Sequence, residues 1–220
     1  MASLGAVFHA HGVLRTRFFD DYLLAATASG CGQVVLPAAG LDTRAFRLAW
    51  PDGVRLFEVD LPDVLNFKRR VPADQVARPR CERVIVPADL RDTWSLTLVA
   101  AGFQETAPTA WLAEGLLIYL SADETSGMLT TVGDLSASDS RLAFEHGGLT
   151  ADSLPAPART MPAMAEYTAL WQGGLGTDAP GWLADHGWRV HTRDRAALAV
   201  SYGRPDPDEA GGGFLTAVRM

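Results

Sequence analysis

Cysteine is scarce in this sequence: Cys31 and Cys81 are the only two among its 220 residues. Their spacing fits neither a disulfide framework nor a metal site, because both need sets of closely spaced ligands or partners. The five histidines show no metal-ligand spacing either. We therefore expect free thiols in a reducing compartment, and no bound metal.

Long apolar runs and an excess of basic charge are also missing. No segment reaches the roughly 18 uninterrupted apolar residues of a membrane span, and the N-terminal arginines follow the apolar residues, the wrong order for a secretory signal. The net charge is −7, with Lys68 as the only lysine. An acidic chain is poorly suited to nucleic acid, because phosphate binding needs a basic surface. The composition predicts one soluble cytoplasmic domain over 1–220, without a membrane or nucleic-acid partner.

Short apolar runs alternate with helical patterns along most of the chain. Almost continuously apolar runs, typical of parallel strands buried on both faces, occupy 33–38, 54–60, 82–89, 109–115 and 140–147. Helical patterns lie between them, one over 42–49 and another opened by a capping box of Ser121 and Glu124. Two further strands are predicted at 188–193 and 212–220. This order predicts an α/β fold with a mostly parallel sheet and helices on both faces.

Two segments stand apart from this alternation. Residues 1–30 are predicted to form an N-terminal helical segment. Residues 148–178 are rich in Pro, Ala and Gly. Long connections of this kind are often functional, so 148–178 is either a substrate-covering segment or a solvated loop with a short packed helix.

The turn after the first predicted strand, in VVLPAAGLDTRAF (34–46), lacks most glycines of a dinucleotide-binding motif. Only Gly40 is present, and Asp42 places a carboxylate where a pyrophosphate would sit. This favours S-adenosylmethionine, which has a ribose but no phosphate and carries an ammonium and a sulfonium. Asp60, which closes the second strand, suits the ribose hydroxyls. The alternative for Asp60 is a solvated aspartate before the helix that starts at Pro62.

Four stretches in the same order resemble the leucine carboxyl methyltransferase family, and most closely its bacterial branch of S-adenosylmethionine-dependent methyltransferases. They are QVVLPAAGLDTRAFRL, FEVDLPDVLNFK, PADLRD and WLAEGLLIYLSADE. The resemblance runs from about Arg15 to His146. It implies a Rossmann-like class I methyltransferase with a seven-stranded, mostly parallel sheet, and S-adenosylmethionine as the cofactor.

The resemblance also implies residues that hold the methionine and ribose parts of the cofactor. Arg15, or else Arg17, resembles the arginine that binds the methionine carboxylate. Gly40 resembles the glycine that lets the methionine lie against the backbone. Asp60 resembles the ribose ligand, and Glu114 the acidic residue near the methionine ammonium.

Further residues are assigned less specifically. Asp89 and Leu90 resemble the adenine contacts, a carboxylate for the exocyclic amine and an apolar surface for the ring. For Asp42, Arg44 and Tyr119 the resemblance implies only membership of the pocket. Their alternatives are, in order, helix capping, surface charge and strand-end packing.

The reaction implied by the family is methyl transfer by in-line displacement. A carboxylate acceptor is ionised at neutral pH and needs no general base. A hydroxyl acceptor needs one, for which His146 is the best candidate and Tyr119 a second catalytic candidate; His9 and His11 are further possibilities. The alternative for His146 is a structural or solvated histidine.

Members of this branch are generally longer, with an N-terminal helical section over the cofactor. We therefore expect an acceptor site that is open to a larger substrate, or completed by a homodimer or partner subunit, or a chain that has lost transfer activity. The leading hypothesis is O-methylation of a carboxylate or hydroxyl on a small natural product, in secondary metabolism. The alternatives are another reaction, such as a cyclisation or elimination, and a non-catalytic partner role.

Overall fold

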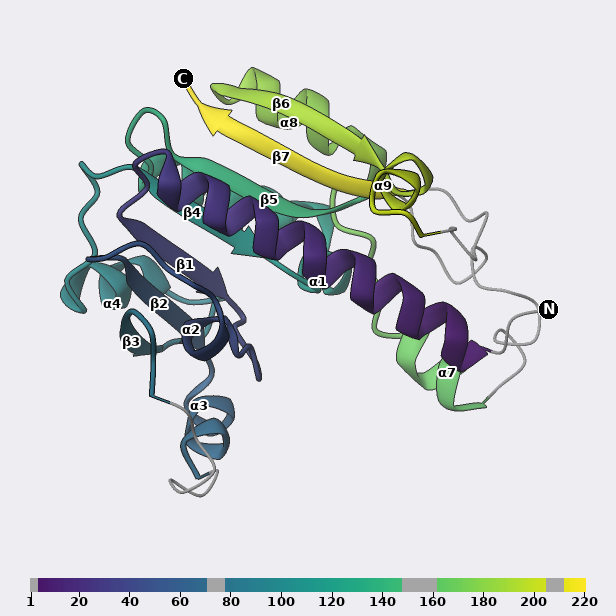
Figure 1. Ribbon diagram of the computed structural model, residues 1–220, viewed down its shortest axis with the longest axis horizontal. Helices are drawn as coiled ribbons and strands as arrows, with labels where there is room; N and C mark the ends of the chain where they lie inside the picture. Colours follow the sequence, from purple (N-terminus) through teal and green to yellow (C-terminus); the bar gives the residue numbers. More distant parts are fainter. Residues whose placement is uncertain (1–3, 71–77, 148–161, 205–211) are drawn as a thin grey trace.

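In the computed structural model, which describes residues 4–70, 78–147, 162–204 and 212–220, a twisted sheet runs through the middle of the molecule (Figure 1). Its seven strands are β1 (Gln33–Pro37), β2 (Arg55–Asp60), β3 (Glu82–Pro87), β4 (Thr109–Ala113), β5 (Arg141–His146), β6 (Trp188–Asp194) and β7 (Gly213–Arg219). Their order is β3-β2-β1-β4-β5-β7-β6, and only β7 runs antiparallel to its neighbours. The predicted seven-stranded, mostly parallel sheet is confirmed.

The central strands are buried on both faces, as their continuous apolar character predicted. In β2, Phe57 faces one hydrophobic core and Leu56 faces another, and both side chains are fully buried. In β4, Trp111 packs in the same core as Phe57, and Leu112 packs in the same core as Leu56. Because successive side chains of a strand point to opposite faces, both of which are buried here, most positions of these strands are apolar, and buried polar residues such as Glu58 need partners.

Helices cover both faces. One core is closed by α1 (Leu4–Ala28), α2 (Arg44–Arg47) and α9 (Arg195–Ser201), and the other by α4 (Trp94–Ala100), α5 (Ala122–Asp134) and α8 (Ala179–Asp185). Figure 1 shows α1 crossing the front of the sheet. Its Tyr22 hydroxyl donates to the Trp111 carbonyl at 3.1 Å, which ties the helix to β4. The remaining helices are α3 (Pro62–Arg69), η1 (Leu117–Tyr119), α7 (Pro162–Thr168) and η3 (Gly176–Asp178).

Two predicted helix boundaries have opposite outcomes. The capping box of α5 is confirmed: Ser121 Oγ accepts from the Glu124 amide, and the Glu124 carboxylate accepts from the Ser121 amide. The helix expected over 42–49 is wrong in length, because α2 has four residues and the chain is extended again at Leu48. The Arg44 carbonyl accepts the Leu48 amide at 3.1 Å, the last turn of the helix, and also the Trp50 indole N–H at 2.9 Å.

Of the two segments outside the strand–helix alternation, one is largely described and the other only in part. Helix α1 occupies most of the predicted segment 1–30. Residues 148–161 of the predicted substrate-covering segment lie outside the described residues; α7 and η3 belong to the rest of it. Cys31 and Cys81 are free thiols, as predicted. Within the described ranges, no helix is both long and apolar enough to cross a membrane.

Candidate functional site

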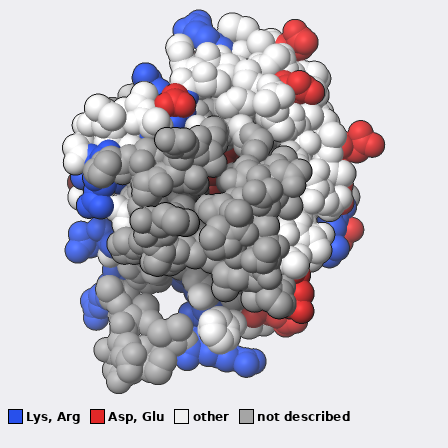
Figure 2. Space-filling view, turned by 90° about the vertical axis from the view of Figure 1, so that its right-hand side faces the viewer, with Lys and Arg blue, Asp and Glu red and all other residues white. Residues whose placement is uncertain are grey.

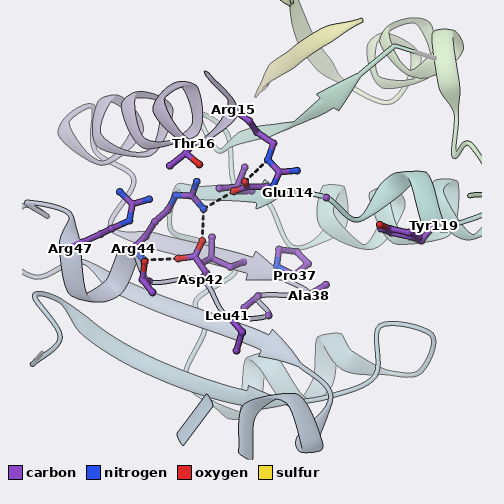
Figure 3. A pocket seen from close by; sticks show the side chains of 16 residues that line it. Arg15, Thr16, Pro37, Ala38, Leu41, Asp42, Arg44, Arg47, Glu114 and Tyr119 are labelled. Atoms are coloured by element: carbon purple, nitrogen blue, oxygen red, sulfur yellow. Dashed lines mark hydrogen bonds and ion pairs between the residues drawn. The ribbon is translucent and has the colours of Figure 1, made fainter. Parts of the chain in front are cut away.

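A pocket of about 490 Å³ lies at the carboxyl ends of β1 and β4, between the turn that follows β1, helices α1 and α2, and the loop after β4 (Figure 3). Several predicted site residues line it: Arg15, Gly40, Asp42, Glu114 and Tyr119. Ligands of open α/β sheets bind at this edge. Figure 2 views the molecule from this end, where acidic and basic side chains both surround the undescribed grey part.

The floor of the pocket is the turn after β1, held by Asp60. Ala38 and Gly40 both have positive φ, 52° and 49°, a conformation that is easy for glycine and costly for alanine. The Gly40 amide donates to Asp60 Oδ2 at 2.6 Å, and the Leu61 amide donates to Oδ1 at 2.7 Å. Asp60 is 9% exposed, so its alternative as a solvated aspartate is wrong. Its ribose role stays a prediction.

Arg44 lines the pocket, as the resemblance implied, although its side chain is almost fully buried, and it joins three structural elements. Its Nε donates to Asp20 of α1 at 2.8 Å, and its Nη1 lies against Asp42 of the turn and 2.6 Å from Glu114 Oε2 after β4. Burial alone would lower the pKa of Arg44, but the carboxylates of Asp42, Glu114 and Asp20 raise it above its ordinary value. With 3% of the side chain exposed, the alternative of a surface charge for Arg44 is wrong.

Asp42 lines the pocket, but its carboxylate is committed to Arg44. Oδ1 accepts the Arg44 backbone amide at 2.6 Å, and Oδ2 pairs with the guanidinium. The helix-capping interpretation therefore accounts for the contact of Oδ1 with the Arg44 amide, but not for the ion pair of Oδ2 with the Arg44 guanidinium. The negative charge of Asp42 is therefore paired with Arg44, and Glu114 is the carboxylate of the pocket that contacts Arg15 (Figure 3).

Arg15 reaches the pocket from α1, and Arg17 does not. Arg15 Nε lies 2.8 Å from Glu114 Oε1, and Nη1 donates to Glu145 at 3.1 Å. Arg17 is two-thirds exposed and pairs with Asp21 one turn later in the helix. Of the two arginines offered by the sequence, only Arg15 lines the pocket.

Glu145 lies outside the pocket lining but pairs with Arg15, and sequence reasoning assigned it no role. It ends β5, pairs with Arg15, and accepts the Gly115 amide at 2.9 Å, so it connects the loop after β4 to α1. Burial raises the pKa of Glu145, and Arg15 and the Gly115 amide oppose that rise. The available signal was its position, an acidic residue at the carboxyl end of a parallel strand next to His146.

Asp89, Leu90 and His146 lie outside the lining of this pocket. Asp89 follows β3 and makes a bidentate pair with exposed Arg91, which lowers the pKa of Asp89 to about 2. Leu90 is half-buried against one hydrophobic core. Their adenine role stays a prediction.

His146 and Tyr119, the two catalytic candidates, are placed differently. Tyr119 belongs to η1 and lines the pocket, at some distance from the ion pairs (Figure 3). His146 ends β5; its Nδ1 is buried and makes no hydrogen bond in the described part of the chain. Burial lowers the pKa of His146, so its ring is neutral at neutral pH. The described residues contain no group of three or more side chains that could hold a metal ion.

The sequence model of the leucine carboxyl methyltransferase family matches residues 2–133. A protein of Parafrankia sp. (strain EAN1pec), named "Putative S-adenosyl-L-methionine-dependent methyltransferase", is 50% identical over all of this chain and 71% of its own length. A protein of Streptomyces coelicolor with the same description is 44% identical over 94% of this chain and 74% of its own length.

Solved structures with little sequence identity share the fold. A DUF574 family protein from Streptomyces avermitilis superposes with a TM-score of 0.67 at 17% identity, over 99% of this chain and 85% of that one. The magnesium protoporphyrin IX methyltransferase of Synechocystis, solved with bound SAH, superposes with a TM-score of 0.61 at 15% identity, over 100% of this chain and 89% of its own. The predicted class I methyltransferase fold is confirmed.

Proposed function

Because this chain belongs to the leucine carboxyl methyltransferase family, we propose that it uses S-adenosylmethionine to methylate an oxygen atom of a small molecule. The observation that carries the proposal is a pair of opposite charges in the pocket, a guanidinium and a carboxylate in contact, next to the turn that contains Gly40. Arg15 and Glu114 supply those two charges, 2.8 Å apart.

The pocket residues suit the amino-acid end of such a cofactor. An α-amino acid presents a carboxylate and an ammonium together, and Arg15 and Glu114 are their natural partners. The pocket volume of about 490 Å³ is within the range of small-molecule sites. Asp60 keeps lone pairs for ribose hydroxyls beyond the two amides it already accepts. The turn offers one glycine and a carboxylate, which suits a ligand without phosphates.

When bound, S-adenosylmethionine supplies an electrophilic methyl group on a sulfonium. The chain's own residues contribute alignment, which is the main requirement of an in-line displacement. A carboxylate acceptor needs nothing more. For a hydroxyl acceptor, the neutral His146 ring is a base that can take the proton on a ring nitrogen, and Tyr119 lies where it can contact a substrate. A natural-product acceptor, and a second copy or partner that completes its site, belong to the same proposal.

The test combines calorimetry with detection of S-adenosylhomocysteine. The purified chain should bind S-adenosylmethionine and form S-adenosylhomocysteine with members of a panel of small carboxylic acids, phenols and alcohols. No binding of S-adenosylmethionine would refute the proposal. Binding without product across the whole panel would instead favour another reaction, such as a cyclisation or elimination, or a non-catalytic partner role. Product with amines alone would refute the choice of oxygen.

A further inference from the structure

Glu114 divides its two carboxylate oxygens between two arginines of different character. Oε1 lies 2.8 Å from Arg15 Nε, and Oε2 lies 2.6 Å from Arg44 Nη1. Arg15 is one-third exposed, whereas Arg44 is 3% exposed. Glu114 is therefore bound on one side by a cation that solvent and ligands can reach, and on the other by a cation enclosed in the protein (Figure 3).

The two contacts also differ in how firmly they are held. Arg15 Nε makes no hydrogen bond with suitable geometry in the described part of the chain, so its contact with Glu114 is an ion pair without a directed N–H. Arg15 also has a second carboxylate, Glu145, to which it donates. The Arg15–Glu114 contact is thus one that a ligand carboxylate can replace at low cost.

Arg44, in contrast, is braced from two other directions. Asp20 accepts from its Nε at 2.8 Å, and Asp42 binds both its Nη1 and its backbone amide. A planar guanidinium with several donors can serve three carboxylates in fixed directions, which a lysine ammonium on a flexible stem does less well. Asp20 and Asp42 fix Arg44, and Arg44 in turn fixes Oε2 of Glu114.

We propose that Arg44 is a positioning residue for cofactor binding: it holds Glu114 through Oε2 and leaves Oε1 for the ammonium of the amino-acid part. The inference rests on the proposed function, because it names what holds one group of that site. It assigns Arg44 no contact with the cofactor. When Arg15 turns to a ligand carboxylate, Arg44 keeps Glu114 in place.

The test compares two neutral thioethers that differ in the amino-acid part alone. S-adenosylhomocysteine has this part, and 5′-methylthioadenosine has a methyl group in its place. Arg44→Gln should lower the affinity for S-adenosylhomocysteine by about tenfold or more, the range for loss of a hydrogen bond to a charged group. Its affinity for 5′-methylthioadenosine, measured by the same calorimetry, should stay within about twofold of the unmodified chain.

A double-mutant cycle separates positioning from a general structural role. In a Glu114→Gln background, Arg44→Gln should cost little further affinity for S-adenosylhomocysteine, because the residue through which it acts is already altered. Arg83→Gln is the control: it removes an arginine whose side chain is 14% exposed from another carboxylate, Glu58, and should leave the ratio of the two affinities unchanged.

The outcomes decide between the two proposals. Equal losses for both thioethers, or a full additive loss in the double variant, would overturn the positioning role of Arg44. If Arg44→Gln does not fold, Arg44→Lys, which keeps the positive charge, replaces it in the same two affinity measurements. Arg44→Lys should weaken binding of S-adenosylhomocysteine but not of 5′-methylthioadenosine. An unchanged ratio of the two affinities would contradict the positioning role of Arg44. Failure of the unmodified chain to bind S-adenosylhomocysteine and S-adenosylmethionine would refute the proposed function itself.

Discussion

Asp60 is a buried carboxylate that holds the turn at the floor of the pocket. Its two oxygens accept the Gly40 and Leu61 amides and thereby join the ends of β1 and β2. Each oxygen retains a second lone pair, so a pair of ribose hydroxyls can still be accepted. The two amide hydrogen bonds explain why a carboxylate at this position is compatible with burial.

We predict that Asp60→Ala weakens S-adenosylmethionine binding by about 1–3 kcal/mol, through loss of a charged acceptor. Calorimetry gives the affinity directly. Asp63→Ala, at an exposed position in the first turn of α3, is the control and should bind normally. Unchanged affinity in the Asp60 variant would contradict the ribose assignment.

His146 leads to a prediction on pH. Burial lowers its pKa below the ordinary value of 6.5, so between the two values the unfolded chain binds more protons than the folded chain. The free energy of unfolding therefore rises with pH through this window and falls as the pH drops through it. His146→Gln should flatten the dependence, measured by urea unfolding from about pH 5 to pH 7.

An exposed histidine serves as the control for that measurement. His191→Gln should keep the pH dependence of the unmodified chain. A His146→Gln profile with the same slope as the unmodified chain would show that the His146 ring is not desolvated in the folded state.

At the scale of elements, one buried carboxylate fastens β2 to β3 and α3. Glu58 is fully buried, and it accepts from Lys68 of α3 at 2.8 Å and from two nitrogens of Arg83 of β3 at 2.9 and 2.6 Å. The only lysine of the chain is therefore placed in a structural ion pair. Removing the carboxylate would leave two cations close together in a poorly hydrated site.

We predict that Glu58→Gln lowers the free energy of unfolding by about 3–5 kcal/mol, the range for breaking a buried ion pair. Urea unfolding measures this. Glu82→Gln is the matched control on the neighbouring strand: its partner is Arg55, its side chain is 61% exposed, and its loss should cost about 1 kcal/mol or less. Equal costs for the two variants would contradict the argument from burial.

At the scale of the whole molecule, the free energy of unfolding should depend on which ligand is present. A ligand that binds the folded chain alone raises the free energy of unfolding by about 2.7 kcal/mol at one hundred times its dissociation constant. We predict such a rise with S-adenosylmethionine and none with NAD at the same concentration, because the turn after β1 lacks the glycines that a pyrophosphate needs. Urea unfolding with each ligand tests this, and stabilisation by NAD would contradict it.

Much of the fold could be predicted, because its determinants are local. Apolar runs with two buried faces predicted the central strands, and Ser121 with Glu124 predicted the start of α5. Helix α2 could not be bounded in the same way. The chain turns extended at Leu48, and Trp50 folds back onto the Arg44 carbonyl, a tertiary contact that propensity and periodicity do not encode.

The candidate site was likewise predictable in part. Because strand ends meet at one edge of a parallel sheet, the sequence by itself indicated that Arg15, Gly40 and Glu114 gather there, and the turn chemistry favoured a ligand without phosphates. It did not indicate that Asp89 and His146 lie outside this pocket. The tertiary structure alone decided how those charges pair. Arg15 meets Glu145 across 130 residues of sequence, and Arg44 is enclosed by carboxylates from α1, the turn and the loop after β4. Ion-pair partners are set by distances of a few ångströms between packed elements, and those distances exist only after the sheet and its helices have assembled.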